Sequence, residues 1–174
     1  AAANYIDSRS GKLYPLDSPR WCSDDRTPLL VTPGKGLSRD EIDGRNRSLW
    51  RYRAALPVHI ARPITLGEGC TPLVQQEWGD LRPFFKLEWF NPTGSFKDRG
   101  SAVMLSYLRQ IGVEAVLEDS SGNGGSSVAG IGAAGGMRVK ILVPAATSPA
   151  KIAQVRAYGA EVQLVEGPRE ESEA

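Results

Sequence analysis

Apolar and polar positions recur with two different periods in the second half of the chain, which separates strands from helices. Residues 84–89, Phe-Phe-Lys-Leu-Glu-Trp, are rich in aromatic side chains and partly alternate, which predicts a strand. Val103, Leu105 and Leu108 then recur at helical spacing, which predicts a helix over residues 97–110.

The same alternation continues along the chain. The predicted elements are a strand at 115–119, a helix rich in small residues at 125–135, a strand at 139–143, a helix from Pro149 to Gly159 and a strand at 162–165. Ser148 followed by Pro149 is typical of a helix start, and Gly159 of a helix end. Helices of ~10–15 residues between strands indicate βαβ units. We therefore expect an α/β domain with a parallel sheet, helices on its faces and right-handed crossovers.

Three segments of different character divide the chain. Residues 1–48 are rich in Asp, Ser, Arg, Pro and Gly and show little periodicity, so we expect an irregular segment of loops and short strands. Residues 49–83 are expected to form strands and loops, and residues 84–174 the βαβ domain. Residues 167–174 resemble the start of another helix.

Composition excludes several classes of function. The chain has 174 residues, with 21 Lys and Arg against 20 Asp and Glu, and no basic run marks a nucleic-acid partner. No apolar stretch is long enough to span a membrane, and the N-terminus lacks a signal-peptide core, so we expect a cytoplasmic protein. Cys22 and Cys70 lie far apart and His59 is the single histidine, so no metal site is expected.

Lys97 is the strongest candidate for covalent chemistry. It follows a turn, Asn91-Pro92-Thr93-Gly94, and Ser95 three residues before Asp98 predicts a capping box that places Lys97 in the first helical turn. A cation there is disfavoured by roughly 0.3–1 kcal/mol. A lysine whose neutral form is favoured suits bonding to an aldehyde cofactor, whereas an isolated lysine at a helix start is more often ordinary surface charge.

A second candidate is the loop from Ser120 to Gly125, between a predicted strand and a predicted helix. The carboxyl end of a parallel strand is where α/β sheets bind ligands, and glycines let the backbone come close to one. The alternative is a plain glycine-rich turn. By contrast, the G-x-G-x-x-G match from Gly130 to Gly135 lacks a strand directly before it, so we interpret it as a helix face that packs tightly on the sheet.

Three motifs, in order, resemble those of one enzyme family. They are LGEGCTPL from Leu66 to Leu73, NPTGSFKDR from Asn91 to Arg99, and SSGNGGSS from Ser120 to Ser127; the stretch from Lys151 to Val165 also fits. They are similar to motifs of the fold-type II pyridoxal-phosphate enzymes, whose fold is like that of tryptophan synthase β. Within that group they most resemble the threonine synthases. The resemblance runs from about Leu49 to Val165.

The resemblance implies a role for individual residues. Lys97 would carry pyridoxal 5′-phosphate on its amine and act as the catalytic acid and base, with Phe96 also at the cofactor. Asn123 would hydrogen-bond the ring oxygen of the cofactor. The α-carboxylate of an amino-acid substrate would be held by Ser120, Ser121, Gly122, Gly124 and Gly125. The family often has Thr where this chain has Gly124, so a hydroxyl is lost there and substrate preference could change.

The resemblance also implies that residues 1–174 correspond to roughly the N-terminal half of an enzyme that is a homo-oligomer, a dimer, when intact. In the family, the glycine-rich loop around the cofactor phosphate and a Ser or Thr near the pyridine nitrogen come from the second half. Residues 49–83 would belong with the missing larger domain, and exposed apolar surface is expected. Some relatives carry a zinc-ribbon-like segment at the N-terminus. Here Asp7 and Ser10 replace its first cysteine pair and only Cys22 remains of the second, so residues 1–48 are expected to be a degenerate form without zinc.

The implied reaction is the replacement of phosphate on O-phosphohomoserine by water to give threonine. Two alternatives stay open: another fold-type II enzyme, such as a threonine or serine dehydratase or a β-replacement synthase, and a noncatalytic half-domain. The Asn91-Pro92 pair favours threonine synthase over dehydratases.

Other polar and aromatic residues have simpler interpretations. Glu68 either contacts substrate or stabilises its turn, and the residues alone do not choose between these roles. The tryptophans are expected to be packing residues; they are Trp21, Trp50, Trp78 and Trp89. Four arginines could serve a substrate phosphate, but solvated charge is the simpler interpretation; they are Arg45, Arg47, Arg51 and Arg99.

Overall fold

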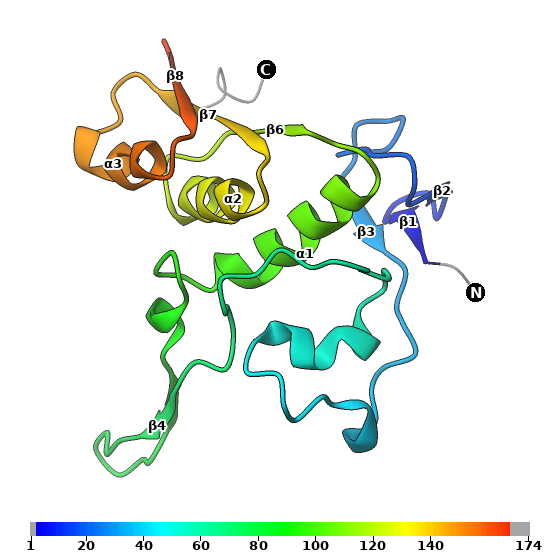
Figure 1. Ribbon diagram of the computed structural model, residues 1–174, viewed down its shortest axis with the longest axis vertical. Coiled ribbons are helices and arrows are strands. Elements are labelled where there is room, and N and C mark those ends of the chain that lie inside the picture. The colour runs from blue at the N-terminus through cyan, green and yellow to red at the C-terminus, as the bar shows by residue number, and fades with distance from the viewer. Residues whose placement is uncertain (1–2, 168–174) are drawn as a thin grey trace.

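The computed structural model describes residues 3–167 and consists of three small sheets and a set of helices (Figure 1). In chain order the elements are β1 (Asn4–Asp7), β2 (Leu13–Pro15), β3 (Leu29–Val31), η1 (Arg39–Glu41), η2 (Leu49–Ala55), β4 (Leu73–Gln75), β5 (Phe84–Lys86), η3 (Glu88–Phe90), α1 (Lys97–Gln110), β6 (Ala115–Glu118), α2 (Asn123–Ala134), β7 (Arg138–Pro144), α3 (Pro149–Ala157) and β8 (Glu161–Val165). The labels η denote short 3-10 helices. The helix expected over residues 167–174 lies outside the described residues.

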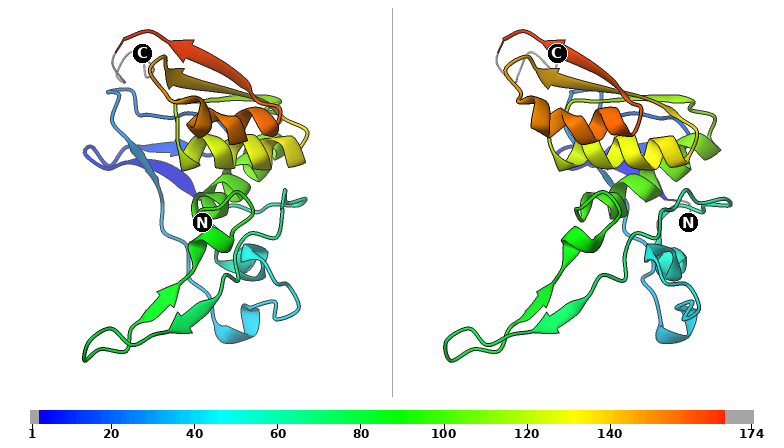
Figure 2. Two further views of the ribbon diagram at one scale, coloured as in Figure 1. Left: turned by 90° about the vertical axis from the view of Figure 1, so that its left-hand side faces the viewer. Right: turned by 60° about the vertical axis from the view of Figure 1, so that its left-hand side comes forward.

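The predicted parallel sheet is present, with strand order β6-β7-β8. Val116 pairs with Val139, and Ile141 with Val162, both in parallel register. Helices α2 and α3 lie on one face of this sheet, and α1 packs against α2 as the next layer (Figure 2). We expected helices on both faces. Because the strands follow chain order, crossovers of one hand place both connecting helices on the same face.

The main core lies between the sheet and α2, where small residues allow close packing. Ile131, Ile141, Val143 and Leu105 are fully buried in it. A Cβ atom added to Gly132 would lie 2.3 Å from Cγ2 of Val139, so only glycine fits at that approach. The G-x-G-x-x-G match therefore lies in α2 and its C-cap, against the sheet, as predicted.

The hairpin of β4 and β5 is antiparallel and projects away from the helices (Figure 2). The strand predicted at residues 84–89 ends at Lys86, and η3 follows it. Trp78 on this hairpin and Trp89 in η3 are 68% and 65% exposed, and Trp21 is also exposed. The prediction that all four tryptophans are packing residues is therefore wrong for these three, since no described element covers them. Trp50 alone is buried, and the expected exposed apolar surface is observed.

The N-terminal sheet, order β2-β1-β3, is held by the buried Asp7. Its carboxylate accepts hydrogen bonds from the hydroxyls of Ser10 (2.8 Å) and Thr27 (2.9 Å) and from the backbone N–H of Arg9 (2.9 Å). These bonds, with that of Arg9 first, lower the pKa of Asp7 to about 2. Among the described residues, no helix has the length and apolar character needed to cross a membrane.

Candidate active site

The turn that precedes Lys97 is organised by Asp98, and not by the predicted capping box. The residue before α1 is Phe96, whose side chain makes no capping bond, and the hydroxyl of Ser95 accepts from the N–H of Lys97 (3.3 Å). Asp98 is fully buried, and its carboxylate accepts hydrogen bonds from the backbone N–H of Thr93 (2.7 Å) and the hydroxyls of Thr93 and Ser127. The carboxylate thus turns inward toward α2, away from Ser95. The capping-box prediction was wrong because donors distant in sequence compete for this carboxylate.

Thr93 joins the turn to two further helices. Its carbonyl oxygen accepts a hydrogen bond from the side-chain amide of Gln154 in α3 (2.9 Å). A Cβ atom on Gly130 of α2 would lie 2.8 Å from Cγ2 of Thr93, so the methyl group of Thr93 packs directly on the helix backbone there. Together with Asp98, these contacts fix the turn to α1, α2 and α3.

Lys97 itself is exposed at the first position of α1. Its Nζ atom lies 5.1 Å from the ring centroid of Phe96, a distance at which a cation and an aromatic face attract each other. Within residues 3–167 its amine makes no hydrogen bond or ion pair. The amine is therefore accessible for chemistry, beside the Phe96 ring.

The segment Ser120–Gly125 follows β6 as predicted, but the helix begins earlier than expected, so Asn123, Gly124 and Gly125 form the first residues of α2. A Cβ atom on Gly125 would lie 2.2 Å from the carbonyl oxygen of Ser120, so only glycine fits there. A Cβ atom on Gly124 would lie 2.9 Å from Oγ of Ser120 and 3.1 Å from Oε1 of Glu118. The small residue at position 124 thus leaves room for these two side chains.

Glu118, at the end of β6, belongs to the same region and was missed by the sequence analysis. Burial is the largest influence on its pKa and raises it; Asp119 raises it further, while the positive charge of Lys97 lowers it. Glu118 therefore lies within electrostatic reach of Lys97 and in contact distance of the Gly124 position. The sequence pattern around Glu118 is that of a partly alternating strand and does not mark a site residue. Only the fold brings this side chain to the region of the loop.

The structure therefore brings Lys97 and the Ser120–Gly125 loop into one region. One link is direct: Ser127, one turn after Asn123, donates a 2.6 Å hydrogen bond to Asp98, the residue after Lys97. The other is the electrostatic effect of Lys97 on Glu118. Neither Asp98 nor Ser127 was a predicted site residue.

Two other motif residues stabilise the structure. Glu68 is fully buried, and its carboxylate accepts hydrogen bonds from Nε1 of Trp50 (2.8 Å), the hydroxyl of Thr65 (3.0 Å) and the N–H of Leu66 (2.8 Å). This set of donors assigns Glu68 to its turn. Arg99 was expected to be solvated, but its guanidinium forms a two-pronged ion pair with Glu88, at 2.8 and 2.9 Å.

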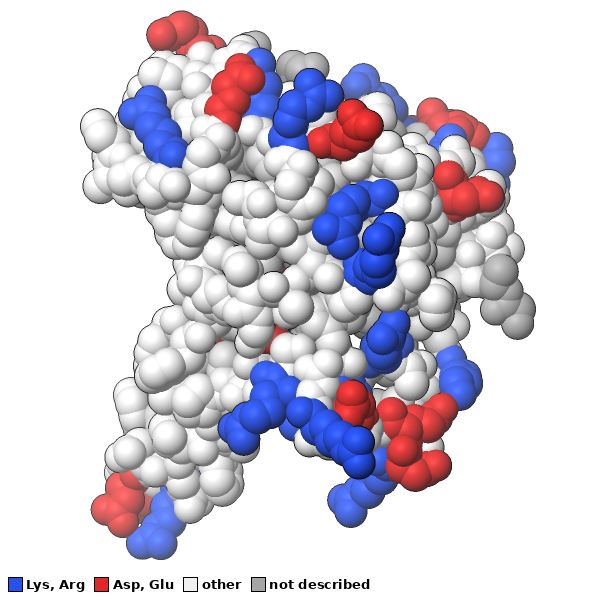
Figure 3. Space-filling model, viewed as in Figure 1, with Lys and Arg blue, Asp and Glu red and all other residues white. Residues whose placement is uncertain are grey.

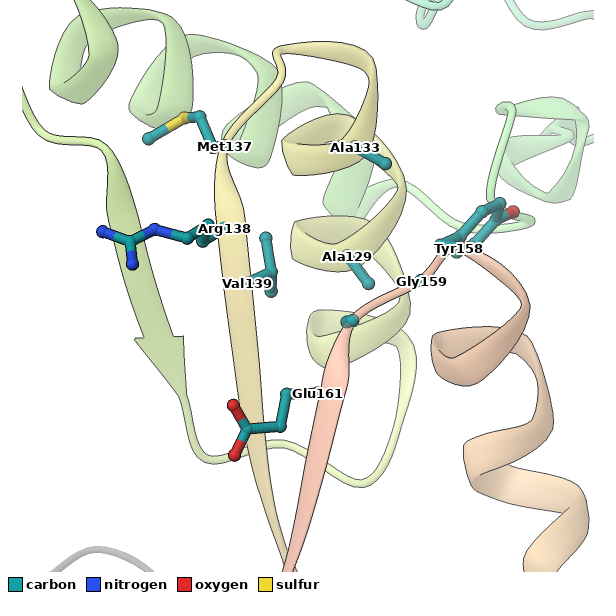
Figure 4. A pocket seen from close by; sticks show the side chains of 9 residues that line it. Ala129, Ala133, Met137, Arg138, Val139, Tyr158, Gly159 and Glu161 are labelled. Atoms are coloured by element: carbon teal, nitrogen blue, oxygen red, sulfur yellow. The ribbon is translucent and has the colours of Figure 1, made fainter.

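A cavity on another side of the domain lies away from Lys97 and the Ser120–Gly125 loop. This cavity of about 320 Å³ lies between α2, β7 and the start of β8. Figure 4 shows Ala129, Val139 and Tyr158 among the side chains that line it. Arg138 and Glu161 begin β7 and β8, so this cavity lies at the amino ends of the strands. Ligands of α/β sheets bind at the opposite, carboxyl ends, where the Ser120–Gly125 loop lies.

The chain is similar in sequence to known proteins. Residues 64–174 match the family model described as "Pyridoxal-phosphate dependent enzyme". The threonine synthase of Halalkalibacterium halodurans is 38% identical over 132 residues, which are 69% of this chain and 37% of that protein. The threonine synthase of Methanocaldococcus jannaschii is 37% identical over 138 residues, which are 75% of this chain and 34% of that protein. This chain thus spans about a third of the length of these relatives.

Solved structures give the same picture of the fold. A hydrogen sulfide-producing enzyme from Fusobacterium nucleatum superposes with a TM-score of 0.56 at 34% identity, over 60% of this chain and 37% of that one. The cysteine synthase of Entamoeba histolytica superposes with a TM-score of 0.54 at 32% identity, over 60% of this chain and 35% of that one.

Proposed function

Since this chain belongs to the family of pyridoxal-phosphate dependent enzymes, we propose that Lys97 is the residue that binds the cofactor aldehyde. The observation that supports this role most directly is its setting. Lys97 presents an unpaired amine at the first position of α1, and the next residue, Asp98, accepts a hydrogen bond from Ser127 of α2, the helix that begins with Asn123. A catalytic amine must be held in a fixed position relative to its substrate, and these hydrogen bonds fix the backbone that carries it.

The residues around Lys97 fit the cofactor. A Cβ atom added to Gly122 would have no heavy atom within 4 Å, so the loop backbone is open to a bound molecule at that residue, and Asn123 is exposed at the start of α2. We propose that Asn123 hydrogen-bonds the ring oxygen and that Phe96 lies at the cofactor. When bound, pyridoxal phosphate supplies a conjugated ring that accepts electron density from the substrate.

The chain's own residues would bind the substrate and move its protons. We propose that Ser120, Ser121 and the backbone of Gly122, Gly124 and Gly125 hold the α-carboxylate of an amino acid. The amine of Lys97 would take the proton from Cα and return protons during the reaction. Burial raises the pKa of Glu118, whose carboxylate lies beside the Gly124 position of this loop.

For the reaction we propose that of a threonine synthase-like lyase. O-phosphohomoserine would lose one proton each from Cα and Cβ, and phosphate would leave from Cγ. A proton would then add at Cγ, the hydroxyl of water at Cβ and a proton at Cα, giving threonine and phosphate. The similarity to two threonine synthases supports this substrate. A second candidate is a related dehydratase or β-replacement enzyme. Gly124 supports it, because the family resemblance implies a Thr at this position and the absence of its hydroxyl could change the preferred substrate.

The first experiment tests the lysine. The 174-residue chain is mixed with pyridoxal phosphate, the adduct is reduced with borohydride, and the modified lysine is identified by peptide mass spectrometry. We expect modification at Lys97. The modification should be lost in Lys97→Ala and retained in Lys35→Ala, which removes an exposed lysine distant from Lys97 in the sequence. Modification spread over exposed lysines, with no preference for Lys97, would refute the assignment.

A second experiment separates the substrates, with a protein that contains both this segment and the rest of the family fold. Phosphate release from O-phosphohomoserine is compared with keto-acid formation from threonine and serine. Phosphate release alone supports the threonine synthase reaction, whereas keto-acid formation alone supports a dehydratase. We expect the 174-residue chain alone to form the lysine adduct without turnover.

A further inference from the structure

A cavity of about 440 Å³ is surrounded by positive charge on a different part of the molecule. It lies between η2, the strand β5 and the start of α1, and its lining includes Arg47, Arg51, Lys86 and Arg99. No acidic side chain lines it among the described residues. Figure 3 shows a row of Lys and Arg side chains below the middle of the visible face, while other Lys and Arg side chains lie across its upper half.

The positive charges of this basic pocket are only partly balanced. Glu88 neutralises Arg99 through their two-pronged ion pair. The amine of Lys86 donates a hydrogen bond to the carbonyl oxygen of Thr71, which carries no net charge. Asp43 accepts a hydrogen bond from the N–H of Arg45 and exerts the weakest of the effects that act on Arg51.

The two remaining arginines lack counter-ions. Arg47 is exposed and makes no hydrogen bond or ion pair with any residue that the structure describes. Arg51 donates from Nη1 to the sulfur of Cys70 at 3.5 Å, while its Nε is buried without a hydrogen-bond partner. A buried guanidinium N–H without an acceptor costs free energy, as does the grouping of like charges. A bound anion would relieve the cost of the grouped positive charges.

The pocket is also held rigid. Trp50, next to Arg51, is buried, and its Nε1 donates a hydrogen bond to the carboxylate of Glu68. The backbone N–H of Leu49 donates to the carbonyl oxygen of Glu68 at 2.7 Å. The turn after Glu68 packs so closely that a Cβ on Gly69 would lie 2.6 Å from the nitrogen of Leu49. Because this backbone is fixed before any ligand arrives, the ordering that opposes binding falls mainly on the exposed side chain of Arg47.

We propose that the basic pocket binds a phosphate group, carried by inorganic phosphate or by a small phosphomonoester. A tetrahedral dianion matches several converging cations, and guanidinium groups bind phosphate oxygens in pairs. The site is separate from that of Lys97: Arg99 is two positions further along α1, and side chains with that spacing point to different sides of a helix. Neither Lys97 nor the Ser120–Gly125 loop lines the pocket. The proposal therefore goes beyond the function proposed above.

The test is a titration of the ¹⁵N-labelled 174-residue chain with inorganic phosphate and, separately, with glycerol phosphate, at constant ionic strength. We expect saturable shifts of backbone N–H signals near Arg47, Arg51 and Cys70. The double variant Arg47→Met/Arg51→Met should weaken binding at least about tenfold, as expected for the loss of charge-assisted hydrogen bonds. The tighter of the two ligands identifies the form of phosphate that the pocket prefers.

Three controls keep the proposal falsifiable. Arg45→Met removes a nearby exposed arginine outside the pocket and should leave the affinity within about twofold. Arg47→Met alone removes an exposed side chain without partners, so it should weaken binding without unfolding the chain, even if the double variant misfolds. Lys97→Ala should bind phosphate normally, which separates this site from the proposed cofactor site. The proposal is overturned by linear shifts without saturation, by equal losses in Arg45→Met, or by loss of binding in Lys97→Ala alone.

Discussion

Two carboxylates hold the turn that carries Lys97, one from each side, and their surroundings differ. Asp98 is fully buried and accepts hydrogen bonds from the uncharged groups of Thr93 and Ser127. Glu88 has 25% of its side chain exposed and accepts from the guanidinium of Arg99, from the hydroxyl of Thr71 (2.6 Å) and from the amide of Asn91 (3.0 Å).

The difference shows how burial sets the strength of a polar contact. If Asp98 is removed, its donors stay inside the protein and have no access to water, so their desolvation is uncompensated. If Glu88 is removed, water can replace part of its bonds, and an exposed ion pair contributes little. Asp98 should therefore determine whether the Lys97 turn folds, and Glu88 should tune its stability and the charge of the basic pocket.

The largest expected effect is that of Asp98→Ala. The change leaves the N–H and hydroxyl of Thr93 and the hydroxyl of Ser127 without their acceptor, so we expect a loss of about 3–5 kcal/mol in the free energy of unfolding. Chemical denaturation followed by circular dichroism measures it. Asp25→Ala, at an exposed position, should change stability by less than about 0.5 kcal/mol. Equal effects of the two variants would contradict the proposed role of Asp98.

Single donors to the two carboxylates give a finer comparison. Ser127→Ala removes a hydroxyl of α2 that is hydrogen-bonded to both Asp98 and Ser101 of α1, and we expect a loss of about 1–3 kcal/mol. Thr71→Val removes the hydroxyl that donates to Glu88, and we expect about 0.5–1.5 kcal/mol. Thermal unfolding of both variants measures the order. A larger loss for Thr71→Val would reverse the interpretation that Asp98 is the stronger anchor.

The sequence predicted most elements of this region but not the direction of these side chains. Helical periodicity located α1, and the glycine-rich loop was found after β6. The Ser95-x-x-Asp98 spacing also matches a capping box, and nothing local shows that Asp98 turns inward. The deciding partner, Ser127, is 29 residues away, and the close approach of Thr93 depends on Gly130. Glu118 and the basic pocket likewise depend on segments that only the fold brings together.

The exposed tryptophans show again that the local sequence does not reveal which distant residues contact a side chain. A hydrophobic pattern shows that a side chain prefers to be buried, but not which element covers it. Trp50 finds both a core and the carboxylate of Glu68, whereas Trp78 on the β4–β5 hairpin contacts Phe85, with ring centroids 5.9 Å apart, and remains exposed.

The smallest expected effect is the dependence of stability on pH through Glu88. The ion pair with Arg99 is the main cause that lowers the pKa of Glu88 from 4.5 to about 2. A carboxyl group with a lowered pKa in the folded state stabilises the protein above its unfolded pKa and loses that contribution as the pH falls through its folded pKa. Wild type should therefore exceed Glu88→Gln in stability by about 1 kcal/mol above pH ~5, and the two should converge toward pH ~2.

Urea denaturation at several pH values measures this difference. Asp7 and Glu41 also have a pKa of about 2, so both proteins lose stability in acid and only their difference reports Glu88. Glu77→Gln, which removes an exposed ion pair with Arg82, controls for the loss of one negative charge. A difference that stays constant down to pH ~2 would show that Arg99 does not stabilise the charged form of Glu88. Arg99 would then be a further uncompensated cation in the basic pocket, and Glu88→Gln would leave phosphate affinity unchanged instead of raising it.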